Sequence, residues 1–428
     1  MDIAQNTLYI TTPGTWISRD HLTLLIETPV YPPELPPEER TRNRATDWRK
    51  LSIPIHLLES ICLFGPCSIS PAALDLCWQN GVMVNFLTHH GHLQARLAGV
   101  PDTSVTLRRA QFRAADDPAK CALISRNIIA GKLQNARNSL LRAARESEIS
   151  NLKSEISAAA NAIARQIHKL SQLQIPHPKF EISNSKSHSA SNTQMHGINP
   201  STGPDDSGRR DEPNPFPHLK SEISNPKSEI TNLKSEISNP KSLMDTLRGL
   251  EGIGTAIYFS VFNGLLKQQR DVFAFKTRSH RPPRDRINCL LSFIYALLRH
   301  DCIAALTAVG LDPFVGFLHA ERPNRPALAL DLMEEFRPWL ADRLAITLIN
   351  RQQIGTDDFH AREGGAVELT DTARKRVITA WQQRKQEPIS HTLLGKEFRI
   401  GQLPFLQARI LARHLRGDIP GYVPFIPK

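Results

Sequence analysis

The sequence predicts an α+β protein in which a small β-rich N-terminal domain precedes a larger all-α domain that carries a low-complexity insertion. Three observations support this fold class. Alternating apolar and polar residues dominate up to about Gly99, apolar residues at helical spacing dominate from Val105, and short repeats interrupt the helical pattern near mid-chain. The predicted divisions are the β-rich domain 1–99, the linker and first helices 100–173, the disordered repeat-rich insertion 174–241, and the main helical domain 242–428.

The N-terminal part contains short runs typical of strands. Thr7–Thr12 alternates and ends at the turn dipeptide Pro13-Gly14, and His21–Glu27 is a second β-rich run. Pro and charged residues make 32–49 an exposed, extended loop. Further along, the sequence predicts one short helix and two more strands: Ala72–Asn80, Val82–Leu87 and Leu93–Leu97.

Three histidines lie between the last two of these strands. His89, His90 and His92 surround a glycine, a composition that also occurs in metal sites. A hairpin this short directs neighbouring side chains apart, whereas metal ligands must converge. We therefore interpret this segment as a polar hairpin tip.

Helical spacing begins after residue 105. Ala119–Glu146 has its apolar residues on one face of a single long amphipathic helix, and Asn161–Leu173 forms another. The main helical domain starts near Met244, and Thr370-Asp371 is a suitable helix start within it.

The insertion is built from a repeated heptapeptide. Asn-Leu-Lys-Ser-Glu-Ile-Ser occupies 151–157 and again 232–238, with near copies at 218–224 and 225–231. A seven-residue period suggests a coiled coil, but Pro226 and Pro240 recur in the array, and helices do not tolerate regular interior prolines. The sequence therefore predicts a disordered insertion between two helices.

An acidic segment near residue 330 carries the strongest chemical signal. Pro326 opens a helix in which Asp331, Glu334 and Glu335 are spaced i, i+3 and i+4, and His319 lies just upstream. An imidazole with hard oxygen ligands suits Mg²⁺ or Mn²⁺ better than a structural zinc ion. The alternative is that the acids are solvated and the histidine is structural; spacing alone leaves both open.

Two further segments accompany it. Glu251 stands between small residues in Leu247–Gly252, and Ser292 and Tyr295 lie on a helix that follows the basic loop 276–284. Together with Gly310–His319, Leu330–Pro338 and Leu411–Asp418, these segments resemble the CRISPR-associated integrase, the larger of the two universal spacer-acquisition proteins, in its subtype I-C version. The resemblance covers most of residues 1–174 and 242–428.

The resemblance implies a divalent cation, Mg²⁺ or Mn²⁺, bound by Glu251, His319 and Glu334. It places Asp331 as an alternate ligand or as a residue behind the ligands, and Glu335 as a solvated or structural neighbour. It also implies phosphoryl transfer, in which a DNA 3′-hydroxyl attacks a repeat phosphodiester and inserts a spacer. Cleavage of branched DNA would use the same site.

The resemblance further implies partners. These are double-stranded DNA, a second copy of the chain joined through the N-terminal domains, and a smaller CRISPR adaptation protein that completes a heterohexamer. The cations expected to contact DNA are Arg248, Lys276, Arg278, Arg281 and Arg284, and Asn288, Ser292 and Tyr258 are candidates for positioning a phosphate, with core packing equally open for Tyr258.

Composition agrees with a polyanionic partner. The formal charge is +11 and the pI about 9.5, and basic residues cluster at 278–286, 374–376, 384–385 and 413–416. Outside the first cluster, DNA contact and a solvated helix face remain equally open. No Cys-x-x-Cys pair occurs, so the six cysteines are expected as free thiols. No signal peptide is recognised and no apolar run approaches the length of a membrane span, so we expect a cytoplasmic protein without membrane contact.

Three other interpretations use the same residues. The chain could be a metal-dependent nuclease acting on branched DNA in repair, a non-catalytic DNA-binding scaffold, or an inactive relic with repeats in its reading frame. A dedicated partner protein and DNA-joining activity distinguish the integrase from all three.

Overall fold

The computed structural model describes residues 7–32, 35, 44–88, 93–97, 105–175, 240–279 and 282–427. The chain divides into two compact units, residues 1–176 with 239–428, and residues 177–238; every described residue belongs to the first unit. The three-histidine tip and nearly all of the predicted insertion lie outside the described residues. At the margins of the insertion, Ile175 is buried in the core of the first unit and a helix begins at Pro240.

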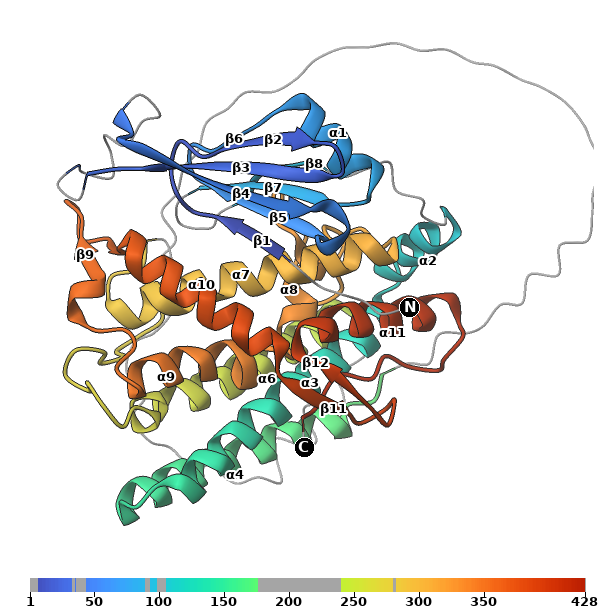
Figure 1. Cartoon of the computed structure of the whole chain (residues 1–428). Coiled ribbons are helices and arrows are strands. Elements are labelled where there is room, and N and C mark those ends of the chain that lie inside the picture. The colour runs from blue at the N-terminus through green and yellow to red at the C-terminus, as the bar shows by residue number, and fades with distance from the viewer. Residues whose placement is uncertain are drawn as a thin grey trace, which may run out of the picture. The chain divides into compact units, whose positions relative to one another are not determined.

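Two four-stranded sheets form the N-terminal region (Figure 1). One has the order β1-β5-β7-β8, with β1, β5 and β7 parallel and β8 antiparallel; the other has the order β4-β3-β2-β6. The strands are β1 Thr7–Ile10, β2 Trp16–Asp20, β3 Thr23–Val30, β4 Asp47–Pro54, β5 Ser60–Phe64, β6 Ser68–Ile69, β7 Met83–Leu87 and β8 Leu93–Leu97. Helix α1, Pro71–Gln79, starts at Pro71 after the Ser70 cap and packs on β2 and β7.

Strand β5 joins this region to the helices because it is buried on both faces. Successive side chains of a strand point to opposite sides. Ile61 and Leu63 belong to a small core shared with α1, while Cys62 and Phe64 belong to the large core shared with the helices. The continuous apolar run of β5 is therefore typical of a central parallel strand covered on both sides.

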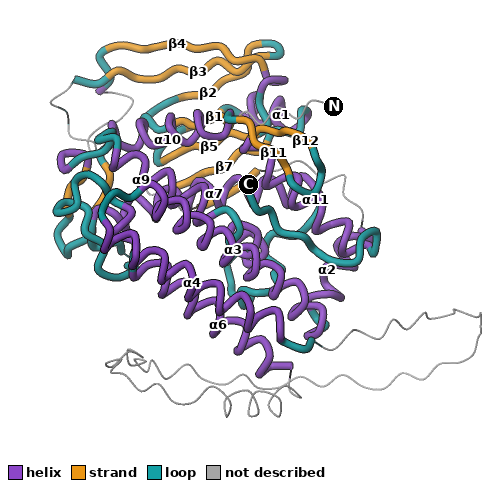
Figure 2. Tube along the Cα trace, turned by 90° about the horizontal axis from the view of Figure 1, so that it is seen from below, coloured by secondary structure: helices purple, strands orange, loops and turns teal. Residues whose placement is uncertain are grey.

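Helices make up most of the rest of the chain. They are α2 Val105–Ala115, α3 Pro118–Glu146, α4 Ser150–Gln172, α6 Pro240–Ser260, α7 Arg286–Val309, α8 Ala327–Met333, α9 Arg343–Asn350, α10 Asp371–Gln386 and α11 Leu403–Arg416. Short 3₁₀ turns lie at Ile55–Leu57, Phe262–Leu265, Thr356–Asp358 and Ile400–Gln402. Helices α3, α4 and α6 pack against one another in a bundle and run side by side in Figure 2.

Helix starts follow local chemistry. Asp117 accepts the amides of Ala119 and Lys120 at the start of α3, and Asp285 accepts the amide of Asn288 at the start of α7. The predicted start at Thr370-Asp371 is confirmed, because the Thr370 hydroxyl accepts the Ala373 amide at the first turn of α10.

The structure corrects several expectations. The helical part is not all-α, because two hairpins interrupt it: β9 Phe359–Ala361 with β10 Val367–Leu369, and β11 Pro388–His391 with β12 Lys396–Arg399. The predicted loop 32–49 ends earlier than expected, since β4 begins at Asp47 and pairs with β3 along its length. The helix expected to start at Asn161 starts at Ser150.

Within the described part of the chain, one apolar helix is long enough to cross a membrane, contrary to expectation. Helix α7 has 24 residues and passes by length and composition, but 78% of its most apolar window is buried inside the protein. A buried core helix of a globular protein has the same composition, because it is apolar on every side. We therefore interpret α7 as the central helix of the core.

Candidate metal and nucleic-acid site

The acidic turn, residues 331–335, is buried and not solvated. Helix α8 ends at Met333, a turn covers residues 334–336, and a π-helix follows at Arg337–Asp342 before α9. The relative exposures of Asp331, Glu334 and Glu335 are 0%, 2% and 1%. The three carboxylates do not form one group: Asp331 and Glu334 both approach His319, whereas Glu335 points to the C-terminal segment. The alternative in which these acids are solvated is therefore wrong.

Asp331 organises the loop that carries His319. Its Oδ2 accepts the amides of Phe317 and Leu318 at 2.6 and 3.0 Å, and its Oδ1 accepts the amide and the ring Nδ1 of His319 at 2.9 and 2.7 Å. Gly316 allows this approach, since a Cβ there would lie 2.8 Å from the Ala327 carbonyl carbon and 2.9 Å from Asp331 Oδ2. This contact between Nδ1 and Asp331 holds the ring so that Nε2 points away from Asp331, toward Glu334.

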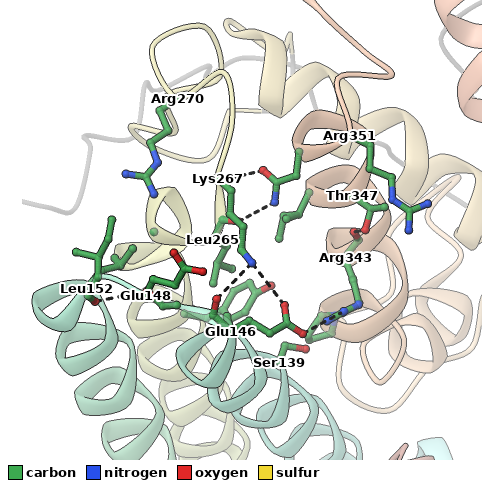
Figure 3. A pocket seen from close by; sticks show the side chains of 18 residues that line it. Ser139, Glu146, Glu148, Leu152, Leu265, Lys267, Arg270, Arg343, Thr347 and Arg351 are labelled. Atoms are coloured by element: carbon green, nitrogen blue, oxygen red, sulfur yellow. Dashed lines mark hydrogen bonds and ion pairs between the residues drawn. The ribbon is translucent and has the colours of Figure 1, made fainter.

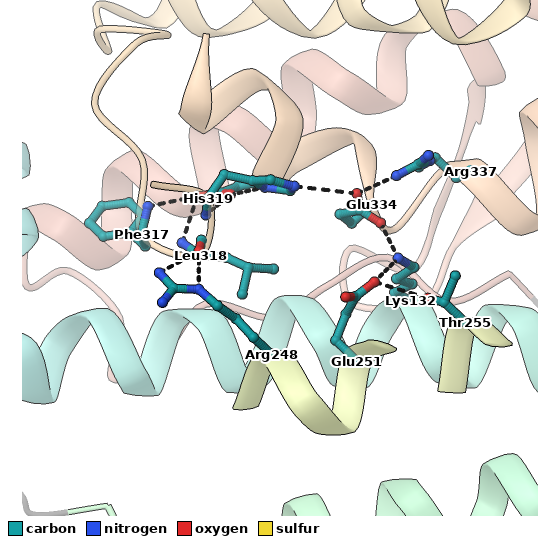
Figure 4. Close-up of polar contacts among 10 residues, drawn as sticks. Lys132, Arg248, Glu251, Thr255, Phe317, Leu318, His319, Glu334 and Arg337 are labelled. Atoms are coloured by element: carbon teal, nitrogen blue, oxygen red, sulfur yellow. Dashed lines mark hydrogen bonds and ion pairs between the residues drawn. The ribbon is translucent and has the colours of Figure 1, made fainter. Parts of the chain in front are cut away.

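Glu334 lies between three cationic or potentially cationic groups. Its Oε1 accepts from Arg337 at 2.6 Å and lies 3.9 Å from His319 Nε2, while Lys132 Nζ lies 2.6 Å from its Oε2. That oxygen has no well-aligned hydrogen-bond donor, so its contact with Lys132 is an ion pair. Figure 4 shows Lys132, from α3, between Glu334 and Glu251 of α6.

Glu251 completes this group of charges. Its Oε1 accepts from Lys132 and from the Thr255 hydroxyl, one turn further along α6. Its side chain remains 26% exposed, as does that of His319 at 23%, whereas Glu334 is 3% exposed. The structure therefore brings Glu251, His319 and Glu334 to one place that opens to solvent on the side of Glu251 and His319.

Electrostatics keep Glu334 ionised. Burial alone would raise its pKa, but Arg337, Lys132 and His319 hold the pKa of Glu334 well below its ordinary value. Glu334 in turn stabilises the charge of Arg337: burial would lower the pKa of Arg337, but the Glu334 carboxylate raises it. Glu334 is thus a permanent anion, as a ligand for a hard cation must be.

The donor set fits a divalent cation, although the side chains are not arranged around one. Among the described residues, no three His, Cys, Asp or Glu side chains are grouped closely enough to hold a metal ion. The physical reason lies in Lys132, whose ammonium separates Glu251 from Glu334. Two carboxylates, an outward imidazole nitrogen and a carboxylate behind that imidazole are the ligand types of Mg²⁺ or Mn²⁺ sites.

Glu335 serves the C-terminal segment. Its carboxylate accepts from the Tyr422 hydroxyl at 2.7 Å, the Phe425 amide at 2.6 Å and the Gln407 side chain at 3.1 and 3.3 Å. Burial raises the pKa of Glu335 to about 8, against the lowering effect of these hydrogen bonds. The expectation of a structural neighbour fits this geometry, and the expectation of a solvated one is wrong.

The predicted DNA contacts differ in their geometry. Arg248 donates Nε and NH2 to the Leu318 carbonyl at 3.2 and 3.1 Å, so it braces the loop next to His319. Arg278 points into the protein, where it donates to Asn288 at 2.6 Å and Ser292 at 3.2 Å. Lys276 and Arg284 are exposed, and Arg281 lies outside the described residues.

The candidates for positioning a phosphate are mostly engaged. Asn288 is buried and donates to the Thr277 carbonyl and to Asp285. Tyr258 is buried beside the rings of Phe259 and Phe262, as in the core-packing alternative. Ser292 accepts from Arg278. Tyr295, on the same helix as Ser292 but not one of these candidates, donates to the buried Asp342, and the Arg337 guanidinium lies 4.3 Å from its ring centre.

The more distant basic clusters are also partly structural. Lys385 is buried and donates to Asp301 at 3.0 Å, so neither DNA contact nor a solvated face describes it. Arg376 donates to the Gln353 carbonyl and to Asp358. All six cysteines are free, as expected, and five of them are buried.

Lys132 and Arg337 are the site residues that sequence reasoning missed. Lys132 stands four residues after Ile128 and three after Ile129, both buried, so it lies within the apolar face of α3. A lysine within a buried face requires an anionic partner. That position was a usable signal for an internal ion pair.

A cavity among the described residues lies away from this site. It measures about 480 Å³ and is bordered by the α3–α4 junction, the 3₁₀ turn after α6, and α9. Figure 3 shows Glu146 at its centre, approached by Lys267 and Arg343. None of the predicted site residues lines this cavity except Tyr258.

Comparison with known proteins identifies the family. The family model described as CRISPR associated protein Cas1 matches residues 8–177 and 207–383. The chain is 37% identical over 421 residues, 98% of each sequence, to the CRISPR-associated endonuclease Cas1 1 of Chlorobaculum tepidum. It is 36% identical over 426 residues to the protein of the same name from Moorella thermoacetica, covering 100% of this chain and 99% of that protein.

Solved structures with this fold include a casposase bound to integration product and a Cas1 protein from Thermotoga maritima. The TM-scores are 0.69 and 0.65 at 18% and 19% identity, and the matches cover 98% and 99% of this chain and 93% and 100% of those chains. A Cas6-RT-Cas1–Cas2 complex matches with a TM-score of 0.66 at 18% identity, covering all of this chain and 37% of that one. At such identities these likenesses concern the fold. Family model and full-length relatives together show that the chain belongs to the Cas1 family of CRISPR-associated endonucleases.

Proposed function

We propose that this chain is a metal-dependent DNA endonuclease and integrase, which inserts spacer DNA into a CRISPR array by attack of a 3′-hydroxyl on a repeat phosphodiester. One observation carries the proposal beyond family membership. Glu251, Glu334 and His319, from three separate segments, meet beside a solvent-exposed opening, with an ammonium between the two carboxylates. Carboxylates gathered at this cost in repulsion and desolvation indicate a site built for a cation.

The residues have separate roles in the proposed reaction. Glu251, Glu334 and His319 Nε2 would hold the cation, which when bound polarises the phosphoryl oxygen and lowers the pKa of the attacking hydroxyl. Asp331 orients the imidazole, and Arg337 fixes one oxygen of Glu334. Arg248 holds the Leu318 carbonyl and thereby the backbone beside His319.

The bond changes balance without a further reactant. A new bond forms between the incoming 3′-oxygen and the repeat phosphorus, the existing phosphorus–O3′ bond breaks, and the proton of the attacking hydroxyl ends on the leaving oxygen. Water in place of the 3′-hydroxyl gives hydrolysis, which accounts for endonuclease activity at the same residues.

We further propose the partners that the family resemblance implies. These are a second copy joined through the N-terminal sheets, a smaller adaptation protein completing a heterohexamer, and double-stranded DNA. The Cas1–Cas2 complexes among structures of the same fold support the smaller partner. The subtype I-C assignment and a cytoplasmic location remain parts of this proposal.

Strand transfer tests the proposal. A short duplex with free 3′-hydroxyls is incubated with a supercoiled repeat-bearing plasmid and the full chain, with Mn²⁺, Mg²⁺ or EDTA, and with and without the small partner. Joining is expected with a metal and not in EDTA. His319→Ala is expected to abolish it, while His168→Ala, at an exposed histidine of α4, is the matched control.

Each other outcome selects another function. Cleavage of branched DNA without joining in any mixture would favour a repair nuclease. DNA binding that neither joins nor cuts, unchanged by His319→Ala, would favour a scaffold or a relic.

A further inference from the structure

Lys132 holds an unusual position for a lysine. It is 8% exposed on the buried face of α3, and its ammonium contacts carboxylates from two other segments, Glu251 on α6 and Glu334 in the acidic turn (Figure 4). A buried ammonium is costly unless it is paired, and two converging carboxylates are equally costly without a cation between them. The Lys132 ammonium and the two carboxylates therefore stabilise one another.

Glu334 has a second cationic partner besides Lys132, because Lys132 contacts Oε2 and Arg337 contacts Oε1. Arg337 holds Oε1 at 2.6 Å, so Glu334 retains one cationic partner when Lys132 moves. Glu251 likewise retains the hydroxyl of Thr255 at 2.9 Å. Both carboxylates can thus keep their place while the ammonium between them is exchanged for another cation.

There is also space next to Lys132 into which its ammonium could move. A cavity of about 30 Å³ lies beside it, bordered among others by Thr255, Asp342 and Arg337, whose charge Asp342 partly offsets. A space of that size accommodates a group as large as a water molecule, and an ammonium is such a group. A lysine has a flexible four-carbon chain and a compact charge, which suits it to such a swing better than a planar guanidinium.

We propose that Lys132 is a tethered counter-ion, which neutralises Glu251 and Glu334 in the metal-free protein and competes with the divalent cation for them. The inference rests on the proposed function in taking these two carboxylates as metal ligands. Metal binding then requires release of the ammonium from both carboxylates. Before the metal binds, Lys132 holds α6 and the acidic turn close together through Glu251 and Glu334. By competing for these carboxylates it lowers the apparent affinity for the metal.

Metal affinity without DNA tests this proposal on the full chain. Free Mn²⁺ is measured by electron paramagnetic resonance during titration, and thermal melting is followed in EDTA and in Mn²⁺. Lys132→Met keeps the length of the side chain and removes its charge. We expect it to bind Mn²⁺ at least about tenfold more tightly, because a competing positive charge within a few ångströms is gone, and to melt at a lower temperature in EDTA.

The control is Lys120→Met. Lys120 lies on the same helix and, among the described residues, pairs with Asp117 at the helix start and not with a site carboxylate, so Mn²⁺ affinity should equal that of the wild type. Lys132→Gln serves as a second test variant if Lys132→Met does not fold. A Lys132 variant that is folded in Mn²⁺ and unfolded in EDTA also supports the proposal.

Unchanged or weaker Mn²⁺ binding by folded Lys132 variants would overturn it. His319→Ala separates this failure from failure of the proposed function. If the wild type binds Mn²⁺ and His319→Ala does not, the metal site stands and only the role of Lys132 is lost. If neither the wild type nor the Lys132 variants bind Mn²⁺, the metal site itself is disproved, and the counter-ion with it.

Discussion

At the scale of single residues, the acidic turn divides three tasks among three neighbouring carboxylates. Asp331 uses both oxygens on the backbone and ring of the His319 loop, and Glu334 faces the cations of the site. Glu335 points to the C-terminal segment. This geometry supports Glu334 over Asp331 as the direct ligand, because Asp331 has no oxygen left for a metal.

Asp331→Asn should uncouple the imidazole from its support. An amide nitrogen cannot accept a hydrogen bond. Either the amides of Phe317 and Leu318, or the amide and ring Nδ1 of His319, would therefore face an NH₂ group in place of a carboxylate oxygen. We expect joining activity to fall about 10- to 100-fold and the free energy of unfolding to fall by about 1–3 kcal/mol.

Strand-transfer rates and urea unfolding measure these two effects. Asp312→Asn is the control, because the Asp312 side chain accepts the Phe314 amide in the same loop and no hydrogen bond joins it to His319 among the described residues. Wild-type rates in Asp331→Asn would show that His319 needs no fixed orientation.

Asp342 makes stability depend on pH. Burial raises the pKa of Asp342 from 3.8 to about 6, although the Tyr295 hydrogen bond and Arg337 act in the opposite direction. A carboxyl with a higher pKa in the folded chain contributes stability below its ordinary pKa and loses that contribution as the pH rises through the folded value. Wild type should therefore lose up to about 3 kcal/mol relative to Asp342→Asn between pH 4 and pH 7.

Urea unfolding of both proteins at several pH values checks this expectation. Taking the difference between them cancels groups such as Glu334, whose lowered pKa has the opposite effect. A difference that does not change with pH would mean that Asp342 is ionised throughout this range.

At the scale of elements, helix α4 shows how packing decides the structure of a weak sequence. Its first turns contain the heptapeptide 151–157, rich in Ser, Asn and Lys. Ile156 is fully buried and Leu152 packs where Gly264 has no side chain, since a Cβ there would lie 2.5 Å from Leu152 Cδ1. The two apolar residues, four apart, place one face of the repeat against the bundle.

Ile156→Ala should cost about 2–5 kcal/mol of unfolding free energy, because a buried side chain is removed and leaves a cavity. Ile149→Ala is the matched control: Ile149 is 53% exposed, and its loss should cost within about 0.5 kcal/mol. Chemical denaturation of the two variants compares them. Equal stabilities would show that the repeat-derived turn of α4 does not contribute to the stability of the bundle.

The sequence predicts elements well where one pattern runs long. The helical period of α3 and the short runs predicted for β7 and β8 had nearly correct bounds. The hairpins β9–β10 and β11–β12 have strands of three or four residues, too short for alternation to be recognised. The parallel pairing of β1, β5 and β7 depends on distant segments and left no local signal.

The candidate site was predictable only in part for a similar reason. Glu251, His319 and Glu334 came from resemblance and not from spacing, since 68 residues separate Glu251 from His319 and helix geometry relates neither to the other. Lys132 and Arg337 act through the tertiary fold, which brings α3 beside α6 and the π-helix. The period of α3 would have placed Lys132 on the core face, but it gives no information on the groups that Lys132 contacts there.

At the scale of the whole molecule, the first unit is built from both sides of the segment 177–238. Helix α4 before it and α6 after it pack against each other, and Ile175 and Leu243 are buried on either side. The family model also leaves 178–206 unmatched. The cost of closing a loop grows only slowly with its length, so a shorter connection need not disturb the unit.

Replacing 177–238 by a short Gly/Ser linker should therefore preserve the melting temperature, the oligomeric state and Mn²⁺ binding. Scanning calorimetry, size-exclusion chromatography and the Mn²⁺ titration measure these three properties. A longer deletion, 177–247, is the control: it also removes the buried Leu243 and Leu247 and should give unfolded protein. Loss of soluble protein with the shorter deletion would show that the segment supports the fold.

The contact between Glu335 and the C-terminal segment has a consequence for synthesis on the ribosome. The carboxylate next to Glu334 acquires its partners only after Tyr422 and Phe425 have been translated. A nascent chain can already have formed the N-terminal sheets and most helices, since domains fold from the N-terminus as they emerge. This part of the acidic turn is therefore braced only after residues 422–425 have left the ribosome, which delays completion of the proposed metal site relative to the folding of the sheets.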